Sequence, residues 1–361
     1  MKLKKQEIKE IIMIVSSFLV GGLMMYLLMT NISSSIIIQD KTKIYDKTSL
    51  ASSVDKVYDA VVVIESFNGS SQESTGSGFF YKVDNNYAYI LTNEHILTGT
   101  TIQVTTSTDE TDEAEILGKD AYLDLAVIRV KKKIAKKIVT LGSSENVNIG
   151  DSIFTIGSPI SINYKGTVTS GIISGKNRMV QTSVGDNKQG NWLMQVLQID
   201  APINKGNSGG PLLNVNGDVI GICSLKLTDE EIEGMAFAIP IEYAKNHLEE
   251  FEQGKEMQWP EIGISMTNVS NSGTVVNNDI EIPDNIREGV IILSVKEKGS
   301  AEKAKLQKGD IIISIDNNKT KNIAYLKYEL FQHKIGDKVE VKYIRNGKEK
   351  TTTVELNSSK K

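Results

Sequence analysis

Residues 206–225 read GNSGGPLLNVNGDVIGICSL, a serine set among glycines and followed at once by two short apolar runs. Glycine adopts backbone dihedrals that other residues avoid, so it can turn amide N–H groups toward the oxygen of Ser208. Asn216-Gly217 favours the type I′ turn of a β-hairpin. The stretch therefore predicts a reactive serine ahead of a hairpin in a mostly β protein. From these residues alone, an ordinary Gly/Ser turn is the alternative.

The serine also satisfies G-x-S-x-G, the nucleophile elbow of α/β-hydrolases, in which a helix follows the serine and a catalytic histidine comes later in the chain. A hairpin pattern follows Ser208 instead, so the context excludes the elbow. In a second known type of catalytic serine, found on a β-barrel scaffold, a histidine and then an aspartate precede the serine along the chain. Two upstream residues fit it: His95 in the apolar run ILTNEHIL (90–97), and Asp124 in LDLAVIRV (123–130).

The aspartate of this order lies in a strongly apolar stretch, where an unpaired carboxylate would be very costly to bury. A neighbouring imidazole supplies a partner, which predicts that His95 and Asp124 lie side by side. Asp120 is the competing carboxylate, but it lies in a more polar stretch and fits a turn equally well. A lone histidine is most often structural, so the prediction depends on the order and contexts of all three residues.

The composition restricts the chemistry further. The chain has 361 residues with 41 Lys plus Arg against 45 Asp plus Glu, and its net charge of −4 is untypical of nucleic-acid-binding domains. Cys223 is the single cysteine, which excludes an internal disulfide and zinc sites built on cysteine pairs; its apolar context indicates a buried strand residue. The three histidines lie far apart without ligand spacing. We expect no metal, no cofactor and no nucleic-acid partner.

The rest of the chain indicates two globular domains. Short β-rich runs separated by turn residues fill residues 54–237, a pattern typical of sandwiches and barrels. A helical pattern follows at residues 241–253 and ends at Gly254. After Trp259 a second set of strands begins, with an amphipathic helix near residues 323–331. The expected domains are residues 53–254 and residues 258–356.

The N-terminus carries an uncharged run, IIMIVSSFLVGGLMMYLLM, at residues 11–29. About 20 apolar residues cross a bilayer as one helix, so residues 11–30 are predicted to be a transmembrane helix, after a cytoplasmic tail (1–10) and before a linker (31–52). A cleaved signal peptide is the alternative. Lysines on both sides give a small positive-inside bias, which favours a single-pass protein of the cell membrane with an extracytoplasmic body.

Taken together, these motifs resemble the HtrA/Deg family of trypsin-like serine proteases over about residues 54–356, and the anchor resembles that of the family's anchored branch. The resemblance implies a mostly β chain: a chymotrypsin-like double β-barrel followed by a PDZ domain and preceded by one transmembrane helix. The residues that carry the resemblance are Ser77-Gly78-Phe79-Phe80, Thr92–His95, Asp124–Val127, Gly166–Ser174, Gln198–Asn204, Gly206–Leu212 and Met235–Pro240.

The resemblance also implies roles for single residues. Ser208 is the nucleophile, His95 the general base and Asp124 the carboxylate that orients it, while N–H groups of Gly206 and Ser208 form the oxyanion hole. Glu94 stands where the family often has asparagine, beside the triad and not in it, so we expect tuning rather than inactivation. The walls of the specificity pocket are apolar and favour small or medium aliphatic side chains; they are implied at Ile203, Leu225 and Leu227.

The second domain resembles a PDZ domain, in which consecutive N–H groups capture a peptide C-terminus while the peptide adds a strand to the sheet. The carboxylate-binding loop is implied at Ile262, Gly263 and Ile264. The resemblance further implies a homotrimer that acts on unfolded or damaged proteins in stress response and quality control. The expected function is a membrane-anchored, extracytoplasmic serine endopeptidase. The alternative is a proteolytically silent or latent PDZ scaffold with chaperone-like binding at the membrane.

Overall fold

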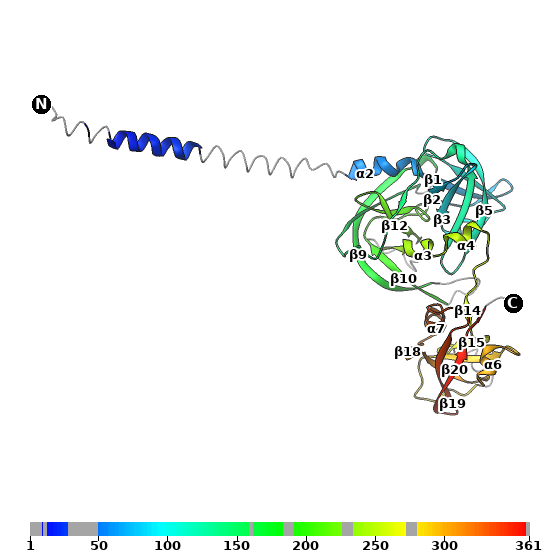
Figure 1. The fold of residues 1–361 in the computed structure, drawn as a ribbon. Coiled ribbons are helices and arrows are strands. Elements are labelled where there is room, and N and C mark those ends of the chain that lie inside the picture. Colours follow the sequence, from blue (N-terminus) through cyan, green and yellow to red (C-terminus); the bar gives the residue numbers. More distant parts are fainter. Residues whose placement is uncertain are drawn as a thin grey trace. The chain divides into compact units, whose positions relative to one another are not determined.

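The computed structural model describes residues 9, 13–27, 50–158, 162–182, 191–225, 234–271 and 280–358 (Figure 1). Residues 53–361 form one compact unit, and residues 1–52 form another.

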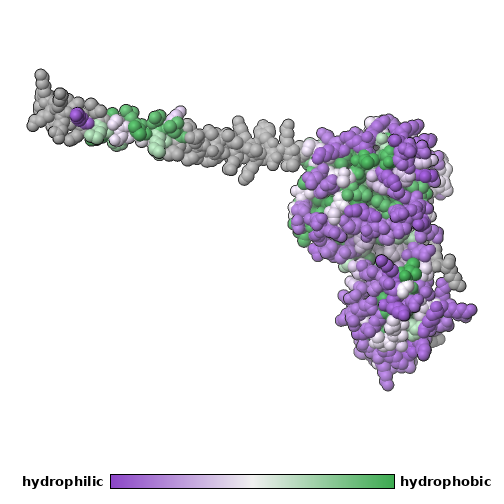
Figure 2. Space-filling view, viewed as in Figure 1, coloured by the Kyte–Doolittle hydropathy of each residue, from purple (hydrophilic) through white to green (hydrophobic). Residues whose placement is uncertain are grey.

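The N-terminal unit contains a helix over residues 13–27 whose side chains are all exposed. The described residues of this helix are mostly hydrophobic (Figure 2). Among the residues that the structure describes, no helix has the length and apolar character needed to cross a membrane. The predicted span at residues 11–30 lies partly outside the described residues, as do most of the predicted tail and all of the predicted linker before Leu50.

The first barrel of the large unit closes in the strand order β1-β2-β3-β6-β5-β4. Its interior is a cluster of buried aliphatic side chains with Phe80, as the alternating apolar pattern of these strands predicts. The strands pair antiparallel, and β3 lies beside β6 so that Thr92 is opposite Ala126. The strands are β1 (Val61–Asn68), β2 (Ser71–Val83), β3 (Tyr87–Thr92), β4 (Thr101–Thr105), β5 (Thr111–Asp120) and β6 (Leu125–Lys131).

The second barrel comes from a seven-stranded sheet in the order β11-β8-β9-β10-β13-β12-β7. A further pairing of β11 with β12 closes six of these strands into a ring. The predicted chymotrypsin-like double β-barrel is thereby confirmed. The strands are β7 (Thr140–Leu141), β8 (Ser152–Gly157), β9 (Thr167–Thr182), β10 (Trp192–Ile199), β11 (Pro211–Asn214), β12 (Asp218–Cys223) and β13 (Ala236–Pro240).

The hairpin predicted at Asn216-Gly217 joins β11 to β12, but its turn type differs from the prediction. Gly217 has a φ of 87°, whereas Asn216 is not in the left-handed region that a type I′ turn requires at both central positions. Gly217 N–H donates to Asn214 O at 2.9 Å, and the Asn214 side chain accepts from the amides of Asn216 and Asp218. The Asn214 side chain therefore stabilises a turn over residues 214–217, and the left-handed conformation falls on Gly217.

Three short helices flank the barrels: α2 (Leu50–Val57), α3 (Ile241–Lys245) and α4 (Leu248–Glu252). The single helix predicted at residues 241–253 is therefore wrong, because the chain breaks it at His247. The break has a packing reason: α3 packs on β12 and β13 of the second barrel, while α4 packs on β5 and β6 of the first. Ile241 and Phe251 are each fully buried, one against each barrel.

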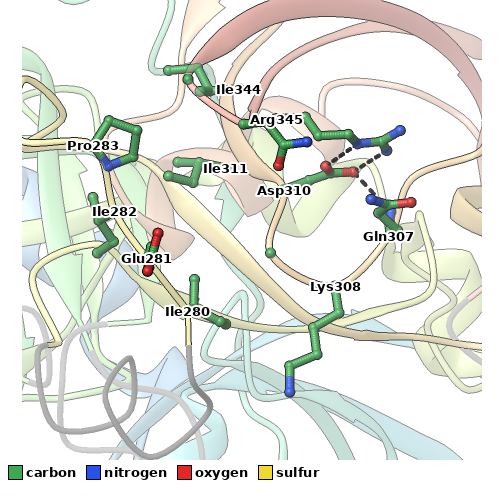
Figure 3. A pocket seen from close by; sticks show the side chains of 13 residues that line it. Ile280, Glu281, Ile282, Pro283, Gln307, Lys308, Asp310, Ile311, Ile344 and Arg345 are labelled. Atoms are coloured by element: carbon green, nitrogen blue, oxygen red, sulfur yellow. Dashed lines mark hydrogen bonds and ion pairs between the residues drawn. The ribbon is translucent and has the colours of Figure 1, made fainter.

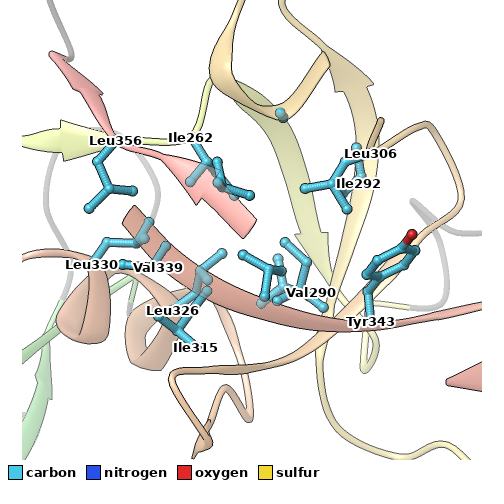
Figure 4. Close-up of a cluster of buried hydrophobic side chains, with 14 residues drawn as sticks. Ile262, Val290, Ile292, Leu306, Ile315, Leu326, Leu330, Val339, Tyr343 and Leu356 are labelled. Atoms are coloured by element: carbon cyan, nitrogen blue, oxygen red, sulfur yellow. The ribbon is translucent and has the colours of Figure 1, made fainter. Parts of the chain in front are cut away.

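The C-terminal domain is a six-stranded sheet in the order β15-β16-β17-β19-β20 with β18 on β17, beside a short β14–β21 pair. Helix α7 covers the sheet and buries Leu326 and Leu330 in one core with Ile292 and Val339 (Figure 4). The PDZ fold is thereby confirmed. The elements are β14 (Pro260–Glu261), β15 (Ile264–Asn268), β16 (Val290–Val295), α6 (Ser300–Lys303), β17 (Ile311–Ile315), β18 (Asn318–Lys319), α7 (Ile323–Leu330), β19 (Lys338–Arg345), β20 (Lys348–Glu355) and β21 (Asn357–Ser358).

Candidate active site

The histidine and the aspartate come together because their strands are neighbours. His95 lies in a 3₁₀ turn, Glu94–Ile96, that follows β3. Asp124 directly precedes β6 and has a left-handed φ of 53°. Since β3 and β6 pair along their length, the end of one strand meets the start of the other. The structure therefore places these two predicted residues side by side.

The contact between the imidazole and the carboxylate has the geometry of an orienting pair. His95 Nδ1 lies 2.8 Å from Asp124 Oδ1 and 2.9 Å from Oδ2, and the backbone N–H of His95 donates to Oδ1 at 3.1 Å. Ser224 Oγ donates to Oδ2 at 2.8 Å. The carboxylate is 2% exposed, so these donors replace the water that it loses. The Nδ1 proton faces the carboxylate, which leaves Nε2 as the basic nitrogen.

The competing carboxylate, Asp120, does not touch the imidazole. It is buried and accepts hydrogen bonds from Leu123 N and Trp259 Nε1, each at 2.8 Å. Burial raises the pKa of Asp120, and these donors oppose the shift. Asp120 therefore shapes the loop before Asp124 and ties it to the start of the second domain.

The serine lies between β10 and β11 in the second barrel and is 4% exposed. Its Oγ accepts a hydrogen bond from Leu225 N at 3.1 Å. Among the described residues, no hydrogen bond joins Ser208 Oγ to His95. Such bonds between nucleophile and base are often long in an unliganded enzyme and shorten when substrate binds. In this structure the hydroxyl is therefore turned toward the Leu225 amide.

The amides of Gly206 and Ser208, the predicted oxyanion donors, have no acceptor among the described residues. Among the described residues, neither Gly206 N–H nor Ser208 N–H donates to a protein atom, although Gly206 is buried. Both carbonyls are held: Ser77 Oγ donates to Gly206 O at 2.6 Å, and Ser77 N–H donates to Ser208 O at 2.8 Å. Gly206 has a φ of 100°, a conformation that favours glycine. The two amides are available to an anionic oxygen, and Ser77 fixes the loop that carries them.

The residue after the serine must also be glycine. Gly209 has a φ of 81°, and a Cβ there would lie 2.2 Å from Ser77 O and 2.4 Å from Thr92 Oγ1. Thr92 Oγ1 itself donates to Ser77 O at 2.7 Å. The close approach of the serine loop to β2 and β3 therefore requires a residue without a side chain at this position.

The predicted specificity pocket is only partly within the described residues. Ile203 is partly buried and packs against the core of the second barrel. Leu225 contacts the serine through its amide, as above, while Leu227 lies in residues 226–233, outside the described residues. The apolar walls of the pocket stay a prediction.

Cys223 is fully buried and lies 3.4 Å from Thr155 Oγ1. Burial raises the pKa of its thiol to about 12, so the thiol carries no nucleophilic thiolate at neutral pH. Within the described residues, no cluster of three His, Cys, Asp or Glu side chains could hold a metal ion. Ser208, and not Cys223, is therefore the candidate nucleophile of this site.

Two supporting residues were not assigned from the sequence. Ser77 belongs to a motif that carries the resemblance, yet nothing in its own context indicates that it would hold Gly206. Ser224 directly follows the apolar strand β12, and its local context indicates no role. Both act through contacts with residues about 100 or more positions away, which no local pattern encodes.

In the second domain, a small pocket of about 100 Å³ lies between β15 and α7. Gly263 has a φ of 74° and directly precedes β15, and among the described residues the amides of Ile262 and Gly263 have no backbone acceptor. The Ile262 side chain is buried in the domain core, whereas Ile264 is partly exposed toward the pocket. The predicted carboxylate loop therefore offers free N–H groups at one end of an apolar groove that is lined by Ile264, Met266, Leu326, Leu330 and Phe331.

A larger hollow of about 660 Å³ lies elsewhere on the second domain, beside Asp310 and Arg345 (Figure 3). The Arg345 guanidinium donates to both oxygens of buried Asp310 at 2.6 Å and to Lys305 O at 2.8 Å. These internal bonds use the Asp310 carboxylate and the Arg345 guanidinium at this edge of the sheet.

Family models match both domains: a trypsin-like peptidase domain over residues 76–222 and a PDZ domain over residues 260–356. A "Serine protease Do-like HtrA" of Lactobacillus helveticus is 34% identical over 321 residues, which cover 86% of this chain and 76% of that protein. A "Serine protease HtrA-like" of Staphylococcus epidermidis is 38% identical over 291 residues, 79% of this chain and 49% of that protein. The chain thus spans about half the length of several curated relatives that it matches.

Solved structures give the same result. A serine endoprotease from Yersinia pestis has a TM-score of 0.61 and 28% identity, covering 86% of this chain and 98% of that chain. The HtrA-type protease AlgW with a tripeptide has a TM-score of 0.61 and 26% identity, covering 87% and 98%. With the double barrel, the His95–Asp124 pair and the PDZ fold, these likenesses lead to one conclusion. The chain belongs to the HtrA family of serine proteases, with a trypsin-like peptidase domain followed by a PDZ domain.

Proposed function

We propose that the chain is an endopeptidase whose Ser208, His95 and Asp124 act as a triad. The proposal is carried by the doubly hydrogen-bonded His95–Asp124 pair, together with a serine loop in which two amides have no acceptor among the described residues. His95 Nε2 takes the proton of Ser208 as the oxygen attacks the substrate carbonyl, and buried Asp124 stabilises the imidazolium that forms. The amides of Gly206 and Ser208 donate to the oxyanion. His95 then protonates the leaving amine, and water releases the acyl group.

The resting hydroxyl requires one local change before attack. Ser208 Oγ accepts from Leu225 N–H in this structure, so a rotation of the side chain toward His95 must precede proton transfer. Such a rotation of one side chain is fast compared with typical turnover. This arrangement also supports the second candidate, a latent enzyme in which a ligand of the PDZ domain favours the competent rotamer.

The proposed substrates are unfolded or damaged proteins. Extended chains expose the peptide bonds that a barrel cleft can bind, and exposed C-termini fit the groove between β15 and α7. The free amides of Ile262 and Gly263 support capture of a terminal carboxylate, with the peptide pairing along β15. The proposal includes a homotrimer, with a solution mass near three times 39.7 kDa.

We further propose that residues 11–30 anchor the chain in the cell membrane and that the two domains lie outside the cytoplasm. The support is the uncharged run of residues 11–29. Protease added to intact cells is expected to digest residues 31–361. Digestion only after lysis would contradict this topology.

Degradation of a reduced and alkylated protein, which cannot refold, tests the activity. The full chain in detergent micelles is compared with its Ser208→Ala variant, with and without a free peptide. Cleavage by the first and a loss on the order of 10⁶-fold in the variant is the expected result. Cleavage that appears only with peptide supports the latent form. Absence of Ser208-dependent cleavage under both conditions contradicts the proposal and favours the scaffold.

A further inference from the structure

A lysine on the groove helix of the PDZ domain carries a charge without a carboxylate partner. Lys327 lies on α7 and lines the small pocket together with Leu326 and Leu330. Its Nζ lies 3.4 Å from the phenol oxygen of Tyr122 and 5.0 Å from the centre of that ring. Among the described residues, no carboxylate lies within 4 Å of this ammonium. A neutral phenol and a ring face therefore form its surroundings.

The carboxylates of the groove lining and of α7 interact with other residues. Glu261 also lines the pocket, but its Oε1 lies 3.8 Å from Nζ of Lys296. Glu329 on α7 accepts from Asn318 Nδ2 at 2.8 Å. Neither carboxylate neutralises Lys327, and burial lowers the pKa of this lysine. A partly buried cation of this kind gains from an anion that arrives with a ligand.

An aromatic cluster packs beside Lys327. Trp259 and Phe331 stack with ring centroids 4.4 Å apart and an angle of 13° between their planes. Tyr122 packs edge-on against both rings, at 6.0 Å and 5.4 Å. Trp259 is further held through its Nε1, which donates to Asp120. The Lys327 ammonium lies against the Tyr122 ring of this cluster, which lines the same pocket.

We propose that the PDZ groove selects peptide C-termini in which an acidic side chain, close to an apolar terminal residue, pairs with Lys327. The inference rests on the proposed capture of peptide C-termini by this groove and adds the chemistry of the peptide. The apolar side chain packs against Ile264, Leu326 and Leu330, while the free amides of the loop bind the terminal carboxylate. Aspartate or glutamate then supplies the counter-charge that the protein itself does not provide.

The test measures dissociation constants by fluorescence anisotropy, using the full chain in detergent micelles with Ser208→Ala to prevent cleavage. The probes are dye-labelled decapeptides that end in valine and carry glutamate, glutamine or lysine at one of the three preceding positions. Each peptide is also made with an amidated C-terminus. The matched protein variants are Lys327→Met, which keeps the apolar stem, and Lys327→Glu, which reverses the charge; thermal unfolding verifies that both fold.

At one peptide position we expect glutamate to bind about tenfold more tightly than glutamine, which corresponds to about 1.4 kcal/mol. Lys327→Met should remove this difference, and Lys327→Glu should shift the preference to lysine. A glutamate preference that persists in Lys327→Met, or no preference at any position, overturns the inference. If amidation still weakens binding in that case, the groove captures C-termini but does not select an acidic side chain. If no free C-terminus binds better than its amide, the proposed capture itself fails.

Discussion

Removal of the Ser77 hydroxyl should disable the oxyanion hole without touching the triad. Ser77 Oγ donates to Gly206 O at 2.6 Å and accepts from Ser158 N–H at 3.1 Å, and the residue is fully buried. In Ser77→Ala, a buried carbonyl and a buried amide both lose a partner, at about 1–3 kcal/mol each. Gly206 O must then find another partner, and the resulting shift of the loop moves the amides of Gly206 and Ser208 away from the position of the oxyanion.

The size of the effect follows from two limits. Loss of these two hydrogen bonds destabilises the present loop by about 2–6 kcal/mol, or roughly 30-fold to more than 10⁴-fold in the population of the competent arrangement. Complete loss of one oxyanion donor costs about 10²–10³ in kcat. We therefore expect kcat to fall about 100-fold while KM changes little, because the donors act mainly on the transition state.

The assay is steady-state cleavage of a chromogenic peptide, with affinity for a peptide aldehyde as a second readout. The aldehyde forms a tetrahedral adduct with the serine, so its binding should weaken in parallel with kcat. Ser74→Ala is the matched control, since Ser74 lies on the same strand and donates to Ile96 O instead. A Ser77→Ala enzyme that loses no more activity than Ser74→Ala, or loses it only through KM, would refute the reasoning.

Three further predictions concern buried groups. Phe251→Ala should lower the free energy of unfolding by about 3–5 kcal/mol in denaturant titrations, because the fully buried ring packs under the first barrel; an effect below about 1 kcal/mol would contradict this packing. Burial lowers the pKa of His247 below its ordinary value, so its contribution to stability is present above about pH 6.5 and is lost as the pH falls. His247→Gln should therefore flatten the decline of Tm between pH 7 and pH 5, and an unchanged slope would argue against it. The Cys223 thiol should resist iodoacetamide at pH 8 in the native chain and react after unfolding in urea, as mass spectrometry would detect; rapid labelling of the native protein would show that the residue is accessible.

The sequence by itself determined the order of the candidate catalytic residues along the chain and the type of fold. The glycines around Ser208, the apolar run that carries Asp124 and the strand that precedes His95 are local patterns, and each places its residue on the right kind of element. The pairing of His95 with Asp124 could be inferred as well, because a carboxylate in an apolar strand needs a partner. The alternating strands likewise predicted barrels, since a half-buried sheet has a period of two.

The tertiary structure decided the contacts that depend on exact placement. Ser77 holds Gly206 across 129 positions, and Ser224 holds Asp124 across 100. The break in the helix at His247 follows from two barrels that each bury one end of the segment. The partner of Lys327 is Tyr122, 205 positions earlier in the chain. Hydrogen bonds and ion pairs form within about 3–4 Å, and only the folded chain fixes distances on that scale between residues so far apart in sequence.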